Sequence, residues 1–251
     1  MTLQSDDRTA DRAARTDRAA RIHALVRSAD PGAAWAIGGP DGVHESSAGS
    51  GACGAPGGTY EVGGLAAVLA LWPAVGTLVE AGELGLHTPL SAYGGALAAE
   101  APAGTTAHHL LTRDAAAPPG TLTRLVEHLS GRPLAAYAAE RIWTPLGMTR
   151  TGFAADGTLH APLADLARFP SHLLSPADHP VSRAWTADSL RIRTGELTPA
   201  RGLFWHPAPH GAWSHGDAAT LWIAPRLHRW ALLLPTRPPG PLRKTFRDAA
   251  L

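Results

Sequence analysis

Residues 59–90, with the sequence TYEVGGLAAVLALWPAVGTLVEAGELGLHTPL, predict the buried helix around which the rest of the chain is arranged. Apolar residues recur there every three or four positions, which places one continuous stripe against a core. Gly82 is expected to end the helix, and the chain should then leave in extended form toward Pro89. The stripe consists of Leu65, Val68, Leu69, Trp72, Val75, Leu78 and Val79.

The chain has 251 residues, which suits one domain with a sizeable core. Residues 1–20 alternate charged residues with alanine, so we expect a flexible or solvated segment followed by a single domain over residues 21–251. A net charge of +1 argues against a nucleic-acid binder. The sequence shows neither a secretory signal nor a run of about 18 apolar residues, so it predicts no membrane association.

Alternating patterns at both ends of the chain predict one antiparallel sheet. Near the N-terminus, residues 33–37 and 43–47 flank a Gly-Gly-Pro-Asp-Gly loop, which is typical of a hairpin. Near the C-terminus, four further strands are expected at residues 202–205, 212–215, 220–224 and 230–234. The fold class predicted from this pattern is α+β, with helices flanking the sheet.

In residues 63–90, Gly-Gly-Leu-Ala-Ala opens an apolar helix that is followed by Pro-Leu. This order of features resembles the serine β-lactamase and penicillin-binding-protein-like family, and in particular the serine hydrolases related to class C β-lactamases. Further segments are similar to motifs of that family and keep its order. The resemblance implies an antiparallel sheet flanked by helices, with a shortened helical lobe at about residues 64–180 between its N- and C-terminal strands. The further segments are TTAHHLLT (residues 105–112), WTPLGMTRT (143–151) and ADLARF (164–169).

The family's catalytic residues are replaced in this sequence. In the family the central helix opens with Gly-Ser-x-x-Lys, in which the serine is the nucleophile and the lysine helps to deprotonate it. Here Gly64 stands at the serine position and Ala67 at the lysine position. The family's Tyr-x-Asn motif is missing, because the chain contains no asparagine, and its tyrosine would fall near Asp114. The resemblance therefore implies the fold without the acylation chemistry.

One catalytic motif keeps a remnant. The resemblance aligns Ser214-His215-Gly216-Asp217 with the family's Lys-Thr-Gly or His-Thr-Gly strand, which borders the oxyanion site. His215 is a candidate for proton transfer, because an ordinary histidine pKa near 6.5 suits that task, and Asp217 is near enough in sequence to influence it. The alternative is a histidine at a strand end bonded to the backbone. The full set of candidate acid/base groups is His215, Asp217, His109, Asp114 and Glu61.

Other features of the sequence predict no further chemistry. The glycine-rich residues 49–58 lack a phosphate-binding pattern and are interpreted as a connector. The single cysteine, Cys53, excludes an internal disulfide and is interpreted as a plain thiol. The histidine pair His108 and His109 lacks the spacing of a zinc helix, so neither a metal nor a cofactor is predicted.

Two functional hypotheses remain open from sequence. The first is a pseudoenzyme that binds a small molecule or a partner in the retained cleft or on its outer surface. The second is a non-covalent acid/base enzyme, such as a cyclase, isomerase or hydrolase of specialised metabolism, that uses some of the five candidate groups. Both hypotheses place the protein in the cytoplasm, because it has a single cysteine and no secretory signal. The sequence indicates no oligomeric state.

Overall fold

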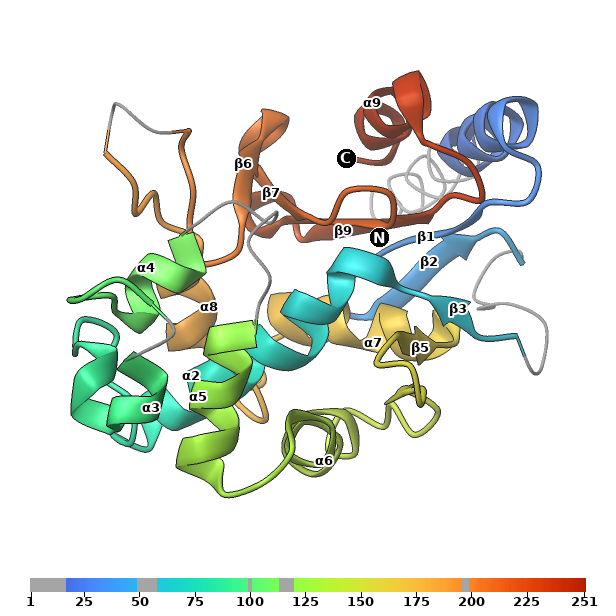
Figure 1. Ribbon diagram of the computed structural model, residues 1–251. Coiled ribbons are helices and arrows are strands. Elements are labelled where there is room, and N and C mark those ends of the chain that lie inside the picture. Colours follow the sequence, from blue (N-terminus) through green and yellow to red (C-terminus); the bar gives the residue numbers. More distant parts are fainter. Residues whose placement is uncertain (1–16, 49–57, 99–100, 113–119, 196–198) are drawn as a thin grey trace, which may run out of the picture.

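The computed structural model describes residues 17–48, 58–98, 101–112, 120–195 and 199–251. These form an α+β protein built on a six-stranded antiparallel sheet, which confirms the predicted fold class (Figure 1). The strands are β1 (Ala34–Gly39), β2 (Gly42–Ser46), β6 (His206–Ala208), β7 (Ala212–His215), β8 (Thr220–Ala224) and β9 (Arg229–Leu234). Their order across the sheet is β2-β1-β9-β8-β7-β6.

The two ends of the chain meet in the middle of this sheet. Strand β1 pairs antiparallel with β9, and Ala36 lies opposite Leu232. All six residues of β1 are buried, because helices cover both faces of the sheet at this strand. The sheet therefore closes only when the N-terminal hairpin and the C-terminal strands have come together.

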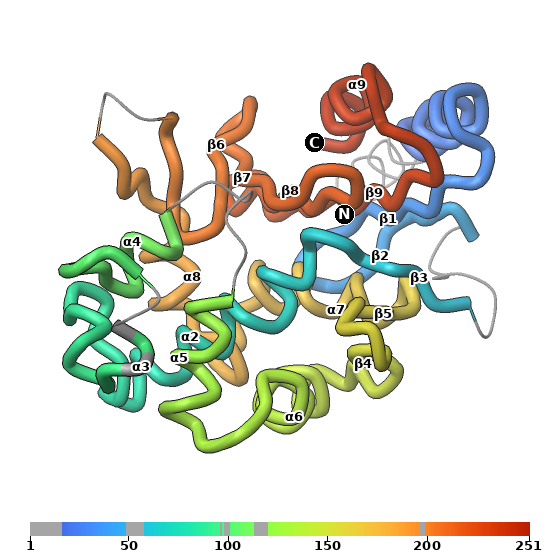
Figure 2. The backbone as a smooth tube through the Cα atoms, in the orientation of Figure 1, coloured from blue at the N-terminus to red at the C-terminus, as the bar shows by residue number. Residues whose placement is uncertain are grey.

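Two helices cover the outer face of the sheet, a helix over residues 17–29 and α9 (Gly240–Ala250), which lie side by side (Figure 2). Their apolar sides pack on Trp35, whose ring centroid lies 6.2 Å from that of Phe246. Residues 17–20, which the sequence places in the N-terminal segment, are the first residues of the first helix, and residues 1–16 lie outside the described part.

Helix α7 (Leu163–Leu174) covers the inner face and packs on β1, β2 and β9. It contains the Asp-Leu-Ala-Arg-Phe segment that the sequence singled out. The buried carboxylate of Asp165 accepts hydrogen bonds from the backbone N–H of Arg150 at 2.8 Å and from the Thr151 hydroxyl at 3.1 Å. This segment therefore fixes the loop that precedes the helix, which is a structural role.

The predicted central helix is present over residues 63–80 and changes its winding along its length. It begins as a 3₁₀ turn (η1, Gly63–Leu65), continues as a π-helical turn (η2, Ala67–Leu71) and ends as α2 (Trp72–Glu80). Gly82 adopts a left-handed φ of 75° just beyond it, as expected of a helix-ending glycine. Residues 60–61 are not part of the helix and form a short strand instead.

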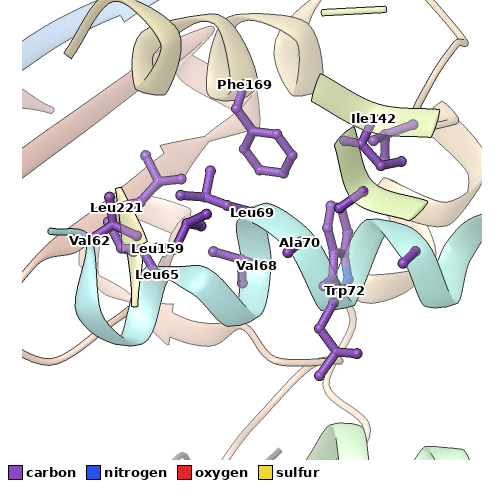
Figure 3. Packing of buried hydrophobic residues seen from close by; sticks show 14 of the residues in the cluster. Val62, Leu65, Val68, Leu69, Ala70, Trp72, Ile142, Leu159, Phe169 and Leu221 are labelled. Atoms are coloured by element: carbon purple, nitrogen blue, oxygen red, sulfur yellow. The ribbon is translucent and has the colours of Figure 1, made fainter. Parts of the chain in front are cut away.

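The central helix is the middle of the main hydrophobic core (Figure 3). Trp72 is fully buried, and its ring centroid lies 6.3 Å from that of Phe169 on α7 and 5.8 Å from that of Trp205. Its indole N–H donates to the Ser189 hydroxyl at 3.0 Å, so the polar atom of this large side chain is satisfied.

By length and composition alone, Gly63–Glu80 could cross a membrane, which differs from the expectation that no such run exists. Buried positions make up 61% of this window, as in the core helix of a folded domain. Its apolar character is therefore explained by packing inside the protein.

The remaining described elements surround the central helix. A second, three-stranded sheet has the order β3-β5-β4 and lies at the start of that helix. Its strands are β3 (Tyr60–Glu61), β4 (Gly152–Phe153) and β5 (Leu159–Ala161). The helices are η3 (Leu90–Tyr93), α3 (Gly95–Ala98), α4 (Ala107–Thr112), α5 (Gly120–Ser130), α6 (Leu134–Ala138), η4 (Ala139–Trp143) and α8 (Arg183–Ser189), with 3₁₀ turns η5 (Pro209–Gly211) and η6 (Pro225–Leu227).

One predicted strand is displaced. Residues 202–205 were expected to form a strand, but Leu203 and Trp205 are buried in the core on either side of Phe204, whose φ is 67°. A left-handed residue interrupts an extended chain, so the strand begins only at His206. The other five predicted strands are present.

Candidate functional site

The start of the central helix and the end of β7 lie together, as the resemblance implies. The Nε2 atom of His215 lies 3.2 Å from the carbonyl oxygen of Gly64. On the other side of the ring, Nδ1 donates to the carbonyl oxygen of Phe204 at 2.5 Å. A single side chain therefore packs between the start of the helix, the sheet and the loop before β6.

Burial controls the charge of His215. Only 3% of the residue is exposed, and this burial lowers its pKa below the ordinary 6.5. The Phe204 carbonyl raises the pKa, the neighbouring His206 lowers it, and the Gly64 carbonyl and Asp217 raise it by smaller amounts. The net effect is a lowered pKa, so the ring is neutral at pH 7 and has one N–H to donate.

Gly64 and Gly216 face each other at this point but have different steric constraints. A Cβ atom built on Gly64 meets only the Cα of Gly216, at 3.9 Å, and the residue is exposed. A Cβ on Gly216 would lie 2.1 Å from the Ala219 carbonyl oxygen, and its φ is 96°. The fold therefore requires glycine at 216, whereas it leaves room for a side chain at 64.

A pocket of about 420 Å³ opens beside the π-helical turn. The central helix contributes two alanines and Leu71, and α5 contributes Thr123 and Glu127, which are one helical turn apart. The Glu127 carboxylate accepts a hydrogen bond from the Leu134 backbone N–H at 2.8 Å, which secures the start of α6. The lining consists of Ala66, Ala67, Leu71, Thr123, Glu127, Leu134, Ala135, Phe153 and Gly157.

The other predicted candidates lie apart. Asp217 is exposed in the turn after β7, and Glu61 is exposed on β3 opposite His160. His109 is exposed on α4, where its Nδ1 accepts from the Thr106 backbone N–H at 3.3 Å. Within the described ranges, no hydrogen bond joins any two of His215, Asp217, His109 and Glu61. Asp114, like Cys53 and residues 49–57, lies outside the described part.

Sequence reasoning missed two groups beside the site. Arg243 on α9 donates from Nη2 to the Gly216 carbonyl oxygen at 2.8 Å and lies 5.9 Å from the Trp222 ring. Leu242, Phe246 and Ala250 repeat at helical spacing, which is a signal that could have predicted α9. Glu127 on α5 is the second group, and no sequence signal places it beside Ala67.

No metal site is formed by the residues that the structure describes, since no three His, Cys, Asp or Glu side chains gather there. The closest histidine rings are those of His87 and His108, with centroids 4.8 Å apart. Burial lowers the pKa of His108, and His87 and His109 lower it further. The planes of the two rings are tilted by 33°.

No family model matches the sequence, and the comparison with curated proteins finds no match. Solved structures do match. EstCE1, described as a hydrolase with promiscuous acyltransferase activity, has a TM-score of 0.75 at 14% identity over 95% of this chain and 99% of its own. A β-lactamase from Mycobacterium bovis has a TM-score of 0.65 at 23% identity, with 88% and 96% covered. The fold is that of the β-lactamases and penicillin-binding proteins.

This β-lactamase fold extends over nearly the whole chain. The D-alanine carboxypeptidase AmpC from Burkholderia cenocepacia also has it, with a TM-score of 0.68 at 17% identity over 95% of this chain and 98% of its own. The recognition made from residues 63–90 and the three further motifs is thus confirmed at the level of fold. The β-lactamase fold here has glycine and alanine, at 64 and 67, where the resemblance places serine and lysine.

Proposed function

We propose that this protein is a β-lactamase-like pseudoenzyme that binds a small molecule beside the start of its central helix and does not acylate. The observation that carries the proposal is the pair Gly64 and Ala67, which supplies neither nucleophile nor base at the start of the central helix. The solved structures with this fold include proteins described as hydrolases and β-lactamases. The proposal is that this chain keeps their fold and has lost their reaction.

The pocket beside Ala67 supports binding. Its volume of about 420 Å³ falls within the range of small-molecule sites, which is roughly 300–1,000 Å³. Apolar walls with a few polar groups are typical of such sites, and here Thr123 and Glu127 are the polar groups. A side chain longer than alanine at position 67 would occupy this space.

The acid/base alternative receives less support. Such an enzyme needs positioned titratable groups that can exchange protons with a substrate. His215 is buried and directs both ring nitrogens at backbone carbonyls, while Asp217 is exposed without a hydrogen bond to it. These contacts support a histidine that is bonded to the backbone of Phe204 and packed against the helix start.

The test is a fragment screen by protein-observed NMR on the parent protein, Ala67→Leu and Ala136→Leu. Ala136 is an exposed residue of α6 outside the pocket lining, so Ala136→Leu is the matched control. We expect fragments that bind the parent and Ala136→Leu, lose binding to Ala67→Leu, and remain chemically unchanged after long incubation. Absence of any such fragment, or conversion of the bound fragments to products, would contradict the proposal.

A further inference from the structure

The pocket lies beside the π-helical turn of the central helix. Ala66, Ala67 and Leu71 all lie on or next to this turn and line the pocket. A π turn is rare in proteins and occurs mostly as a single turn, often at a functional site. The two alanines present only methyl groups to the pocket.

The walls of this pocket are apolar apart from one end. Leu71, Leu134 and Phe153 provide apolar surface from three different elements. Glu127 is the only charged side chain among the described lining residues, and Thr123 lies one helical turn before it on α5. The pocket thus combines a single acidic group with an apolar body.

Glu127 keeps hydrogen-bonding capacity for a ligand. Within the described ranges, its one hydrogen bond is that from the Leu134 N–H to Oε1. A carboxylate has two oxygens and about four acceptor positions, so further donors can bind there. Among the residues that the structure describes, no Lys or Arg side chain lines the pocket to neutralise the carboxylate. A cation that reaches Glu127 would complete the charge balance of the site.

We propose that this pocket binds a primary amine with an apolar body, with the ammonium group at Glu127 and the body against Phe153, Leu71 and Leu134. This assignment rests on the proposed function, because it names the ligand class of the same pocket. Charge complementarity selects an amine over a carboxylic acid, because an anion would be repelled by Glu127 and would find no cation among the described lining residues.

Three probes that differ only in the polar group test the assignment: phenylbutylamine, phenylbutanol and phenylbutanoate. Each is titrated into the parent protein, Glu127→Gln and Ala67→Leu, with chemical shifts followed by NMR. Glu83→Gln is the matched control, because Glu83 is exposed beyond the far end of the central helix and loses the same charge. Glutamine at 127 can still accept from the Leu134 N–H, so α6 should keep its start.

We expect the amine to bind with Kd on the order of 0.1–1 mM, about tenfold or more tightly than the carboxylate, in the parent and in Glu83→Gln. The preference should disappear in Glu127→Gln, and all binding should disappear in Ala67→Leu. Raising the salt concentration should weaken binding of the amine and leave binding of the alcohol unchanged. The salt series gives a readout on the parent protein if a variant fails to fold.

Two results would overturn the assignment in different ways. Equal binding of the three probes, or an unchanged preference in Glu127→Gln, would remove the amine as the ligand class and leave the binding function standing. Failure of every probe to bind, together with a fragment screen that also finds nothing at Ala67, would remove both the ligand class and the proposed function.

Discussion

His215 is held between two backbone carbonyls and is shielded from water. A neutral imidazole has one N–H, and in this ring Nδ1 donates it to Phe204 while Nε2 faces Gly64. Protonation would give Nε2 a hydrogen for the Gly64 carbonyl, but burial of the charge outweighs that gain and lowers the pKa. The residue therefore favours the folded state most when it is neutral.

The lowered pKa of His215 predicts an acid-sensitive fold. Because the unfolded chain takes up a proton near pH 6.5 and the folded ring does so only at lower pH, stability should fall as pH decreases below about 6.5. His108 and His172 also have lowered pKa values and contribute in the same direction. We expect His215→Gln to be less stable than the parent at pH 7.5 and to lose less of its stability between pH 7.5 and 5.5.

Urea unfolding at a series of pH values measures this difference, with His128→Gln on the exposed face of α5 as the control. An identical pH dependence in parent and His215→Gln would refute the burial argument. Retained folding of His215→Gln with loss of fragment binding would instead give the residue the functional role that the sequence hypothesis assigns to it.

The two facing glycines give a paired prediction at the same scale. Gly64→Ser places its Cβ in ordinary van der Waals contact with Gly216, so its thermal midpoint should stay within a few degrees of the parent. In Gly216→Ala the Ala219 carbonyl has to move and an alanine has to adopt a φ of 96°. The free energy of unfolding should therefore fall by on the order of 2 kcal/mol or more. Thermal and urea unfolding of the two variants test this. Equal stability of the two variants would disprove the steric account of the site.

At the scale of elements, the central helix depends on a close contact with α8. A Cβ on Gly76 would lie 2.5 Å from Cδ1 of Trp185. Alanine is a better helix former than glycine by up to about 1 kcal/mol, but the ring of a buried tryptophan has to shift to admit it. We expect Gly76→Ala to be destabilised by about 1–3 kcal/mol.

Gly95→Ala is the control for this helix prediction, because nothing lies within 4 Å of a Cβ at Gly95 on α3. Urea unfolding of both variants separates helix propensity from packing. A stabilised Gly76→Ala would mean that the central helix and α8 pack more loosely than the contact with Trp185 indicates.

Much of this element-scale structure follows from sequence patterns. The apolar stripe of residues 65–79 predicts the central helix because burial on one face repeats with the helical period. The missed strand position has a local cause, since Phe204 adopts a left-handed φ and the real edge strand β6 contains Pro207. Proline is tolerated at a sheet edge but removes the strand signal from the sequence.

The candidate site was predictable only in part. The proximity of Gly64 and His215 follows from the motif order, and the structure confirms it. The contact of Glu127 with the pocket at Ala67 depends on how α5 packs against a π turn, and neither is encoded by a local pattern. Burial of His215, which sets its charge, is likewise a tertiary property.

At the scale of the whole molecule, Asp30 joins the two ends of the chain. Its carboxylate accepts hydrogen bonds from the Thr236 backbone N–H at 2.7 Å, the Thr236 hydroxyl at 2.5 Å and the Arg237 backbone N–H at 3.2 Å. Burial raises the pKa of Asp30, but these hydrogen bonds together outweigh it and hold the pKa below its usual 3.8. The clamp lies between the helix over residues 17–29 and the end of β9.

Asp30→Asn should therefore weaken sheet closure. An amide cannot accept from all three donors, so we expect a loss of about 1–3 kcal/mol at pH 7. The hydrogen bonds of the ionised carboxylate stabilise the fold above pH 3.8, and this stabilisation is lost as pH falls through the lower pKa of the folded state. The difference in free energy of unfolding between parent and variant should therefore become smaller below pH 4. Asp248→Asn, an exposed acid on α9, is the control in urea unfolding. If the difference in free energy of unfolding stays constant down to pH 2.5, the charge of Asp30 is not the source of the stabilisation.

The central claim, that the fold has kept its architecture and lost the acylation chemistry, is tested most directly by intact-mass measurement of the protein after incubation with a fluorescent penicillin. With Gly64 and Ala67 at the helix start, we predict an unchanged mass and no fluorescent band at any time. A stoichiometric adduct on the parent protein, located by peptide mapping to any serine, would contradict the claim.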